Sequence, residues 1–163
     1  MANGDELRGV NGWLAFFIVT LGIINPAFLI YSDIATLNDP DMRFAYGPNW
    51  NLIVTGELAI TAVALAACWF ACYRLLKVFN PASVRIAIGT LWLLALLLLV
   101  AEPLMISSLM GVSLGLLFQA MGPVLIRPIV YSTIWTLYLL NSKRVKNTYY
   151  GVNAQENVGE VFS

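Results

Sequence analysis

The sequence contains no histidine among its 163 residues. This absence excludes a histidine-ligated haem, a histidine metal site and any catalytic triad built on imidazole within this chain. Charged residues are also scarce, because Asp, Glu, Lys and Arg together make up 11% of the chain, whereas a soluble domain usually carries about a quarter. Nine basic and nine acidic residues cancel, so the net charge gives no indication of a nucleic-acid partner.

Cysteine is nearly absent as well, with Cys68 and Cys72 four residues apart in one apolar run. A disulfide between them would strain a helix, and a thiol in apolar surroundings is usually inert, so we expect both to be small buried residues. The sequence also lacks a phosphate-binding loop, a Cys-x-x-Cys motif and metal-ligand spacing. We therefore expect no catalytic site, no cofactor and no metal.

What the sequence does contain is hydrophobic residues, at 60% of the chain with a mean hydropathy of +0.77. About 20 apolar residues suffice to cross a bilayer as a helix. The sequence predicts an all-α, four-helix transmembrane bundle as a single domain over residues 1–149, followed by a disordered polar cytoplasmic tail over 150–163. The four predicted spans are about 13–31, 50–73, 84–100 and 123–141.

Proline and glycine mark kinks and turns in and between these apolar runs. Pro26 frees a backbone carbonyl in the first span and favours a kink, which is tolerated where a neighbouring helix or side chain covers the gap. Turn signals at Asn38-Asp39-Pro40 and Gly47-Pro48 predict a loop over 32–49.

The third span is leucine-rich on all sides, which predicts that it is the helix most exposed to lipid.

The stretch 104–122 has two interpretations, because it is apolar and long enough to span. It carries small and polar residues at helical spacing, and two of its glycines form a Gly-x-x-x-Gly pattern that allows close helix packing. These residues are Ser108, Gly111, Gly115, Gln119 and Gly122.

The distribution of Lys and Arg distinguishes the two interpretations. With four spans, seven cations lie on one side (Arg8, Arg74, Lys77, Arg85, Lys143, Arg144 and Lys146) and two on the other (Arg43 and Arg127). If 104–122 also crosses, the division becomes five to four. The positive-inside rule therefore favours four spans with the N and C termini cytoplasmic, and an extra interfacial or re-entrant helix over 104–122 on the outer face.

Glu57 is the one charged residue within the second span. A carboxylate at that depth costs on the order of 3 kcal/mol on insertion scales, so it should face protein or water and not lipid. Small and polar residues share its helical face, which indicates that this face is directed inward. The face consists of Glu57, Thr61, Ala64, Cys68 and Cys72.

Under this topology Glu57, Glu102 and Arg127 converge on the outer third of the bundle, together with Asp33. We expect Arg127 to pair with Glu57 or Glu102, because an unpaired guanidinium at that depth is expensive. One interpretation is a structural lock that fixes the helix register. The other is a substrate or ion pocket that opens outward beneath 104–122, with Tyr131 and Trp135 lining it.

Several segments together resemble a known family. They are Gly9-Val10-Asn11-Gly12-Trp13-Leu14, Trp50 with Glu57, Pro81, and Arg127 with Ile134-Trp135 and the run from Tyr138 through Ser142, Arg144 and Lys146 to Thr148-Tyr149. Over most of residues 9–149 the chain resembles the bacterial inner-membrane family called domain of unknown function 2569. The resemblance implies a bacterial four-helix membrane protein and no particular activity. It makes Glu57, Arg127, Trp135 and Arg144 the first positions to test.

Three functions compete on these observations. The first is a binding or accessory component of the bacterial inner membrane that packs with another membrane protein or with its own copies, with the bilayer as partner and no nucleic acid. The alternative is a small multi-pass transporter with an outward-facing polar pocket around Glu57 and Arg127. An enzyme such as a quinone-linked disulfide oxidoreductase would need cysteines near the outer face, and Cys68 and Cys72 fall near the inner one.

Overall fold

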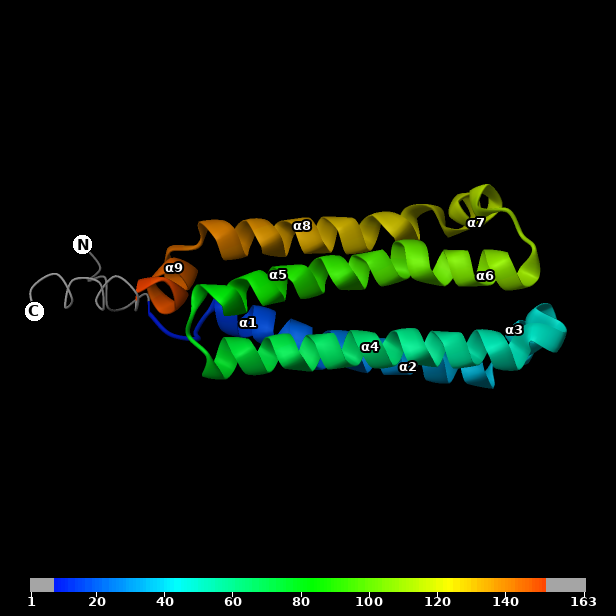
Figure 1. The fold of residues 1–163 in the computed structure, drawn as a ribbon, viewed down its shortest axis with the longest axis horizontal. Helices are drawn as coiled ribbons and strands as arrows, with labels where there is room; N and C mark the ends of the chain where they lie inside the picture. Colours follow the sequence, from blue (N-terminus) through cyan, green and yellow to red (C-terminus); the bar gives the residue numbers. More distant parts are fainter. Residues whose placement is uncertain (1–7, 152–163) are drawn as a thin grey trace, which may run out of the picture.

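The computed structural model describes residues 8–151, apart from the side chains of residues 121, 123 and 124. Within these residues all regular structure is helical, as the sequence predicts. Long antiparallel helical rods lie side by side along one axis (Figure 1). Most of the predicted tail, residues 152–163, lies outside the described part of the chain.

Three of the rods are composite. The first joins α1 (Trp13–Val19), a π-helical turn (Thr20–Ile24) and α2 (Asn25–Asn38). The second is α4 (Trp50–Lys77), preceded by α3 (Pro40–Tyr46) and a 3₁₀ turn (Gly47–Asn49). The third joins α5 (Pro81–Leu96), a second π-helical turn (Leu97–Ala101) and α6 (Glu102–Met110). The chain then continues through α7 (Leu114–Met121), a 3₁₀ turn (Gly122–Leu125), α8 (Ile126–Asn141) and α9 (Lys143–Tyr149).

Three helical stretches, and not the predicted four, are long and apolar enough to cross a membrane. They are Trp13–Asn38, Pro40–Lys77 and Pro81–Met110. The expected fourth span, 123–141, is shorter than predicted because regular α-helix begins only at Ile126 and runs for 16 residues. At 1.5 Å per residue α8 is about 24 Å long, below the roughly 30 Å of a bilayer core.

The predicted loop over 32–49 is wrong, because this segment is mostly helical. The first rod continues to Asn38, and α3 begins one residue after Asp39. The Asp39 carboxylate accepts a hydrogen bond from the Asp41 backbone nitrogen at 2.9 Å, and Pro40 occupies the first turn. A capping acid followed by proline is a helix start signal. The turn signal Asn38-Asp39-Pro40 therefore marks a boundary between two helices and not a loop.

The stretch 104–122 is divided between two helices. Its first part completes the third rod through Met110, where Gly111 adopts a left-handed conformation with φ 67°. Glycine tolerates this conformation because it has no Cβ, and the rod ends there. The Ser113 side chain then caps α7. A helix does lie between the third rod and α8, but it covers only the second half of the stretch, so the predicted small-residue face is interrupted.

The third rod is not the most lipid-exposed helix. It lies between α4 and α8, and a face of mostly small residues is buried there. These are Ser83, Val84, Ala87, Thr90, Leu91 and Ala95. Leucines lie on either side of this narrow face, so the high overall hydrophobicity of the helix did not indicate which side packs against its neighbours.

The two described ends of the chain meet at one end of the bundle (Figure 1). The Gly9 backbone nitrogen donates to the Thr148 hydroxyl at 2.9 Å. The Tyr149 side chain is fully buried, and its hydroxyl donates to the Leu75 carbonyl at 2.6 Å. We call this region, formed by α1, the end of α4, the start of α5 and α9, the closed end.

The predicted inward face of α4 is confirmed. Thr61, Ala64, Cys68 and Cys72 are buried, and Glu57 is half-buried. Both cysteines are free thiols. This face packs within the bundle, so the sequence alone located the interior side of the second rod.

Candidate functional site

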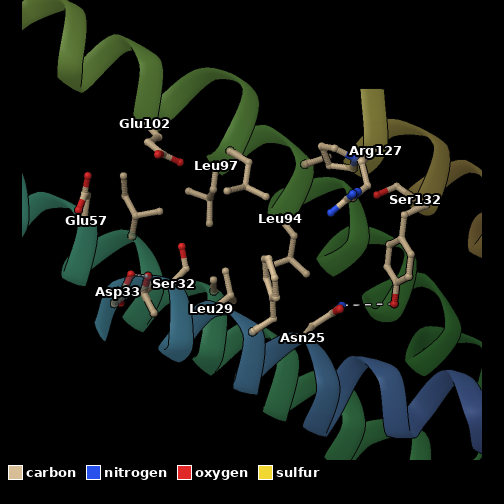
Figure 2. Close-up of a pocket in the computed structure, with 18 of the residues that line it drawn as sticks. Asn25, Leu29, Ser32, Asp33, Glu57, Leu94, Leu97, Glu102, Arg127 and Ser132 are labelled. Atoms are coloured by element: carbon tan, nitrogen blue, oxygen red, sulfur yellow. Dashed lines mark hydrogen bonds between the residues drawn. The ribbon is translucent and has the colours of Figure 1, made fainter. Parts of the chain in front are cut away.

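The half of the bundle away from the closed end contains a cavity of about 460 Å³ (Figure 2). Four segments supply its walls: α2, α4, the α5–α6 rod and the start of α8. Pockets of roughly 300–1,000 Å³ with a few polar groups on apolar walls are typical of small-molecule sites. We call this space the polar cavity.

Two π-helical turns shape the walls. Each five-residue turn is followed by a polar residue and then a proline, Asn25-Pro26 in the first rod and Glu102-Pro103 in the third. A π-helical turn inserts extra backbone and changes the direction of the side chains that follow it, and such turns are frequent at functional sites. Asn25 and Glu102 both line the polar cavity.

The first proline also leaves a carbonyl to be satisfied. In a regular α-helix the Gly22 carbonyl would accept from residue 26, but Pro26 has no N–H. The indole nitrogen of Trp69 on α4 donates to the Gly22 oxygen at 3.2 Å. A side chain from a neighbouring helix therefore meets the backbone one turn before Pro26, which is the condition under which a proline is tolerated in a membrane span.

Carboxylates gather at the outer part of the cavity, meaning the part farther from the closed end. Asp33, Glu57 and Glu102 come from three different rods, and all three line the polar cavity. Figure 2 shows them at one side of the space. The Thr61 hydroxyl donates to the Asp33 carboxylate at 3.2 Å. The cavity therefore has an acidic wall.

Arg127 lines the same cavity but lies on another wall, with Leu94 and Leu97 between it and the acidic side (Figure 2). Within residues 8–151 no ion pair joins Arg127 to Glu57 or Glu102. The expected ion pair is therefore wrong, although the two charge signs do share one cavity. The reason is that Arg127 and the acidic residues lie at different depths along the bundle, as the hydrogen bonds around α8 show.

Two hydrogen bonds set the level of α8 against its neighbours. The Ser132 hydroxyl donates to the Leu91 carbonyl at 2.9 Å, so in antiparallel helices residue 127 is level with about residue 96. Glu102 is then six residues, or roughly 9 Å, farther outward. On the other side Asn25 donates to the Tyr131 hydroxyl at 3.3 Å, which makes residue 127 level with about residue 29. Asp33 is four residues, or roughly 6 Å, farther outward.

Tyr131 forms the inner boundary of the cavity. Its hydroxyl accepts from Asn25 and donates to the Thr20 hydroxyl at 3.4 Å. Trp135, which we expected to line the pocket, lies one turn farther in and is not among the lining residues. Its ring packs on Phe17 with centroids 4.8 Å apart, and only 7% of it is exposed. Trp135 is a core residue of the closed end.

Sequence reasoning missed the wall formed by α2. Asn25, Leu29, Ser32 and Thr36 all line the cavity at helical spacing. The three- and four-residue intervals were visible in the sequence, but the prediction of a loop from residue 32 divided the pattern. A helix continued through Asn38 would have placed these residues on one face with Asp33.

Comparisons with known proteins give one result. No curated protein and no solved structure matches the chain. A family model described as "Protein of unknown function (DUF2569)" matches residues 7–150, which is nearly the whole chain. The chain belongs to the DUF2569 family.

Proposed function

We propose that this protein is a multi-pass protein of the bacterial inner membrane that binds a small molecule in the polar cavity. The observation that carries the proposal is the composition of the walls: four separate helical segments bring three carboxylates, one guanidinium and the Tyr131 hydroxyl to a space of about 460 Å³. A bundle held only by apolar packing has no need of acidic and basic groups around one cavity, since ionisable groups within a membrane are costly.

The arrangement of cations supports an orientation with both termini in the cytoplasm. Arg74, Lys77 and Arg85 lie at the closed end together with the cations of α9, Lys143, Arg144 and Lys146. The positive-inside rule favours this end as cytoplasmic. The two described chain ends also meet there, which supports an even number of crossings with the short α8 as the fourth. The polar cavity then lies in the outer half of the bilayer.

The accessory role has less support than the sequence suggested. Its argument was a set of small-residue faces suited to helix association. The face of α4 that carries Thr61, Ala64 and Cys68 is buried inside the bundle, and Gly111 interrupts the face expected over 104–122. Packing with another membrane protein therefore stays a prediction, and ligand binding takes precedence over it.

Transport would require the ligand to pass the closed end, where Trp135 packs on Phe17 and Tyr149 is fully buried. Binding in the outer half of the bundle needs no such passage.

The experiment that tests the proposal is native mass spectrometry of the detergent-extracted full chain. We expect a molecule of discrete mass bound one to one. The substitution Leu94→Trp fills the cavity that Leu94 lines, and it should remove the bound mass. The matched control is Leu96→Trp, two residues away on a side chain that is 55% exposed. A wild-type spectrum without bound mass, or the same bound mass in both variants, would contradict the proposal.

A further inference from the structure

We infer that the ligand of the polar cavity is a zwitterionic aminophospholipid of the outer leaflet, with its phosphate on Arg127 and its ammonium group toward Asp33, Glu57 and Glu102. This inference rests on the proposed function and names its ligand class. Three independent features of the cavity support it: the side on which it opens, the order of charges with depth, and the apolar surface between them.

The cavity opens sideways between α2 and α8. Among the described residues these helices are not an extensively packed pair, and the Asn25–Tyr131 hydrogen bond joins them at the inner boundary. Farther outward, Phe28 on α2 and Arg127 on α8 both line the cavity and are exposed. With α8 as the proposed fourth crossing, this opening lies between two membrane helices and faces the bilayer. A molecule already in the membrane therefore has direct access.

The order of charges matches a phospholipid headgroup. Arg127 lies roughly 6–9 Å deeper than Asp33 and Glu102 by the helix rise. In an outer-leaflet aminophospholipid the phosphate is joined to the glycerol and lies on the membrane side, and the ammonium group follows after a two-carbon link. Arginine is suited to phosphate because its planar fork donates two parallel hydrogen bonds. The carboxylates are suited to an ammonium group, which has three donors.

The charges of the walls also discriminate among lipids. Three carboxyl groups share the cavity with one guanidinium, so acidic side chains outnumber basic ones there. A phosphatidylglycerol headgroup carries the phosphate without a cation and would be repelled by the acidic wall. Phosphatidylethanolamine offers each wall its opposite charge. Leu29, Leu94 and Leu97 provide the apolar surface against which the glycerol and the first chain carbons can pack.

The test measures lipid binding to the delipidated full chain by native mass spectrometry, with palmitoyl-oleoyl phosphatidylethanolamine and the matching phosphatidylglycerol as probes. We expect wild type to bind the ethanolamine lipid at least about tenfold more tightly. Arg127→Gln should weaken both lipids by about the same factor, because both carry phosphate. In the combined Asp33→Asn, Glu57→Gln and Glu102→Gln variant, the ratio of the affinities for the two lipids should fall to near one.

Controls are taken from α3, outside the cavity. Arg43→Gln and Asp41→Asn change the same residue types at exposed positions and should leave both affinities unchanged. Should the triple variant fail to fold, the single Glu57→Gln variant decides, with the preference expected to fall by about threefold or more. Equal binding of the two lipids to wild type, or an unchanged preference in these variants, overturns the inference.

A third probe separates a lipid from a soluble zwitterion. Glycerophosphoethanolamine carries the same charges without acyl chains, and we expect it to compete only weakly. Competition as strong as that of the whole lipid overturns the lipid assignment. These outcomes differ from failure of the proposed function, because the Leu94→Trp and Leu96→Trp comparison reports on occupancy of the cavity whatever the ligand is.

Discussion

The indole nitrogen of Trp69 lies 3.2 Å from the carbonyl oxygen of Gly22, four residues before Pro26. A tryptophan on one rod thus satisfies the backbone group that a proline leaves open on another. The contact joins the first and second rods beside the π-helical turn that precedes Asn25. It connects the backbone irregularity of the first rod to the wall of the polar cavity.

A double-mutant cycle can measure this connection. Trp69→Phe removes the donor, and we expect it to lower the free energy of unfolding by about 0.5–1.5 kcal/mol, the usual net value of a hydrogen bond. In a Pro26→Ala background the alanine N–H can satisfy Gly22, so the same substitution should cost little. Denaturant unfolding of the detergent-solubilised protein gives both values.

The matched control for this cycle is Trp92→Phe. The Trp92 indole donates to the Thr136 hydroxyl at 3.2 Å, on a different pair of helices. Trp92→Phe should lower the free energy of unfolding by the same amount with and without Pro26. If Trp69→Phe costs as much in the alanine background as in wild type, the indole does not substitute for the missing N–H.

Tyr149 should stabilise the closed end through its hydroxyl. Helix α4 ends at Lys77, so the Leu75 carbonyl lies in its last turn, where intrahelical donors run out. The buried Tyr149 hydroxyl donates to this carbonyl at 2.6 Å. Tyr149→Phe should therefore lower the free energy of unfolding by about 1–3 kcal/mol, the cost of an unsatisfied buried acceptor.

The pH dependence of this variant provides its check. Burial raises the pKa of Tyr149 above its ordinary value of 10.0. The folded protein thus keeps the phenol neutral at a pH where the unfolded chain ionises, and stability from this group is complete below pH 10 and lost as the pH rises above it. The difference in stability between wild type and Tyr149→Phe should shrink above about pH 10. A constant difference up to pH 11 would argue against burial of the hydroxyl.

The sequence predicted which residues face the interior of this bundle better than it predicted the relative depths of the helices. The spacing of Thr61, Ala64 and Cys68 after Glu57 identified the inner face of α4, because one turn of helix has a fixed period. The ion pair between Arg127 and Glu57 or Glu102 depended on the relative depth of three helices. Depth is determined by helix lengths and by hydrogen bonds between side chains, and neither π-helical turn has a sequence signal beyond the proline that follows it.

The closed end shows a second limit of the same kind. The basic residues of α9 give no indication of burial, yet Val145, Thr148 and Tyr149 at three- and four-residue spacing are buried. A seven-residue helix is too short for its periodicity to be conclusive. Only the packing partners, such as Leu75, distinguish a docked helix from a solvated one.

Gly22 and Cys72 are in close approach. A Cβ at Gly22 would lie 2.8 Å from the Cys72 sulfur, and that sulfur donates to the Ile18 carbonyl at 3.5 Å. Gly22→Ala should therefore destabilise the protein by about 1–3 kcal/mol through overpacking. Adding Cys72→Ala removes the sulfur, and most of that loss should be recovered. Thermal unfolding of the single and double variants measures the coupling.

Gly89→Ala is the control for a helical glycine in open space. Nothing lies within 4 Å of a Cβ built at Gly89. Replacing glycine by alanine in a helix stabilises it by roughly 0.5–1 kcal/mol where space allows. We expect this variant to be neutral or more stable than wild type. Equal destabilisation by Gly22→Ala and Gly89→Ala would mean that the approach of the first two rods is not tight at Gly22.

The proposed orientation predicts which surfaces are accessible from outside the cell. In a Cys68→Ala, Cys72→Ala background, Phe44→Cys places a thiol on α3, where the native side chain is 90% exposed. A membrane-impermeant maleimide should label it in intact spheroplasts. Lys143→Cys, exposed on α9 at the closed end, should be labelled only after the membrane is permeabilised. The reverse pattern would place the cation-rich end outside and the polar cavity in the inner leaflet, which would contradict the orientation that the positive-inside rule favours.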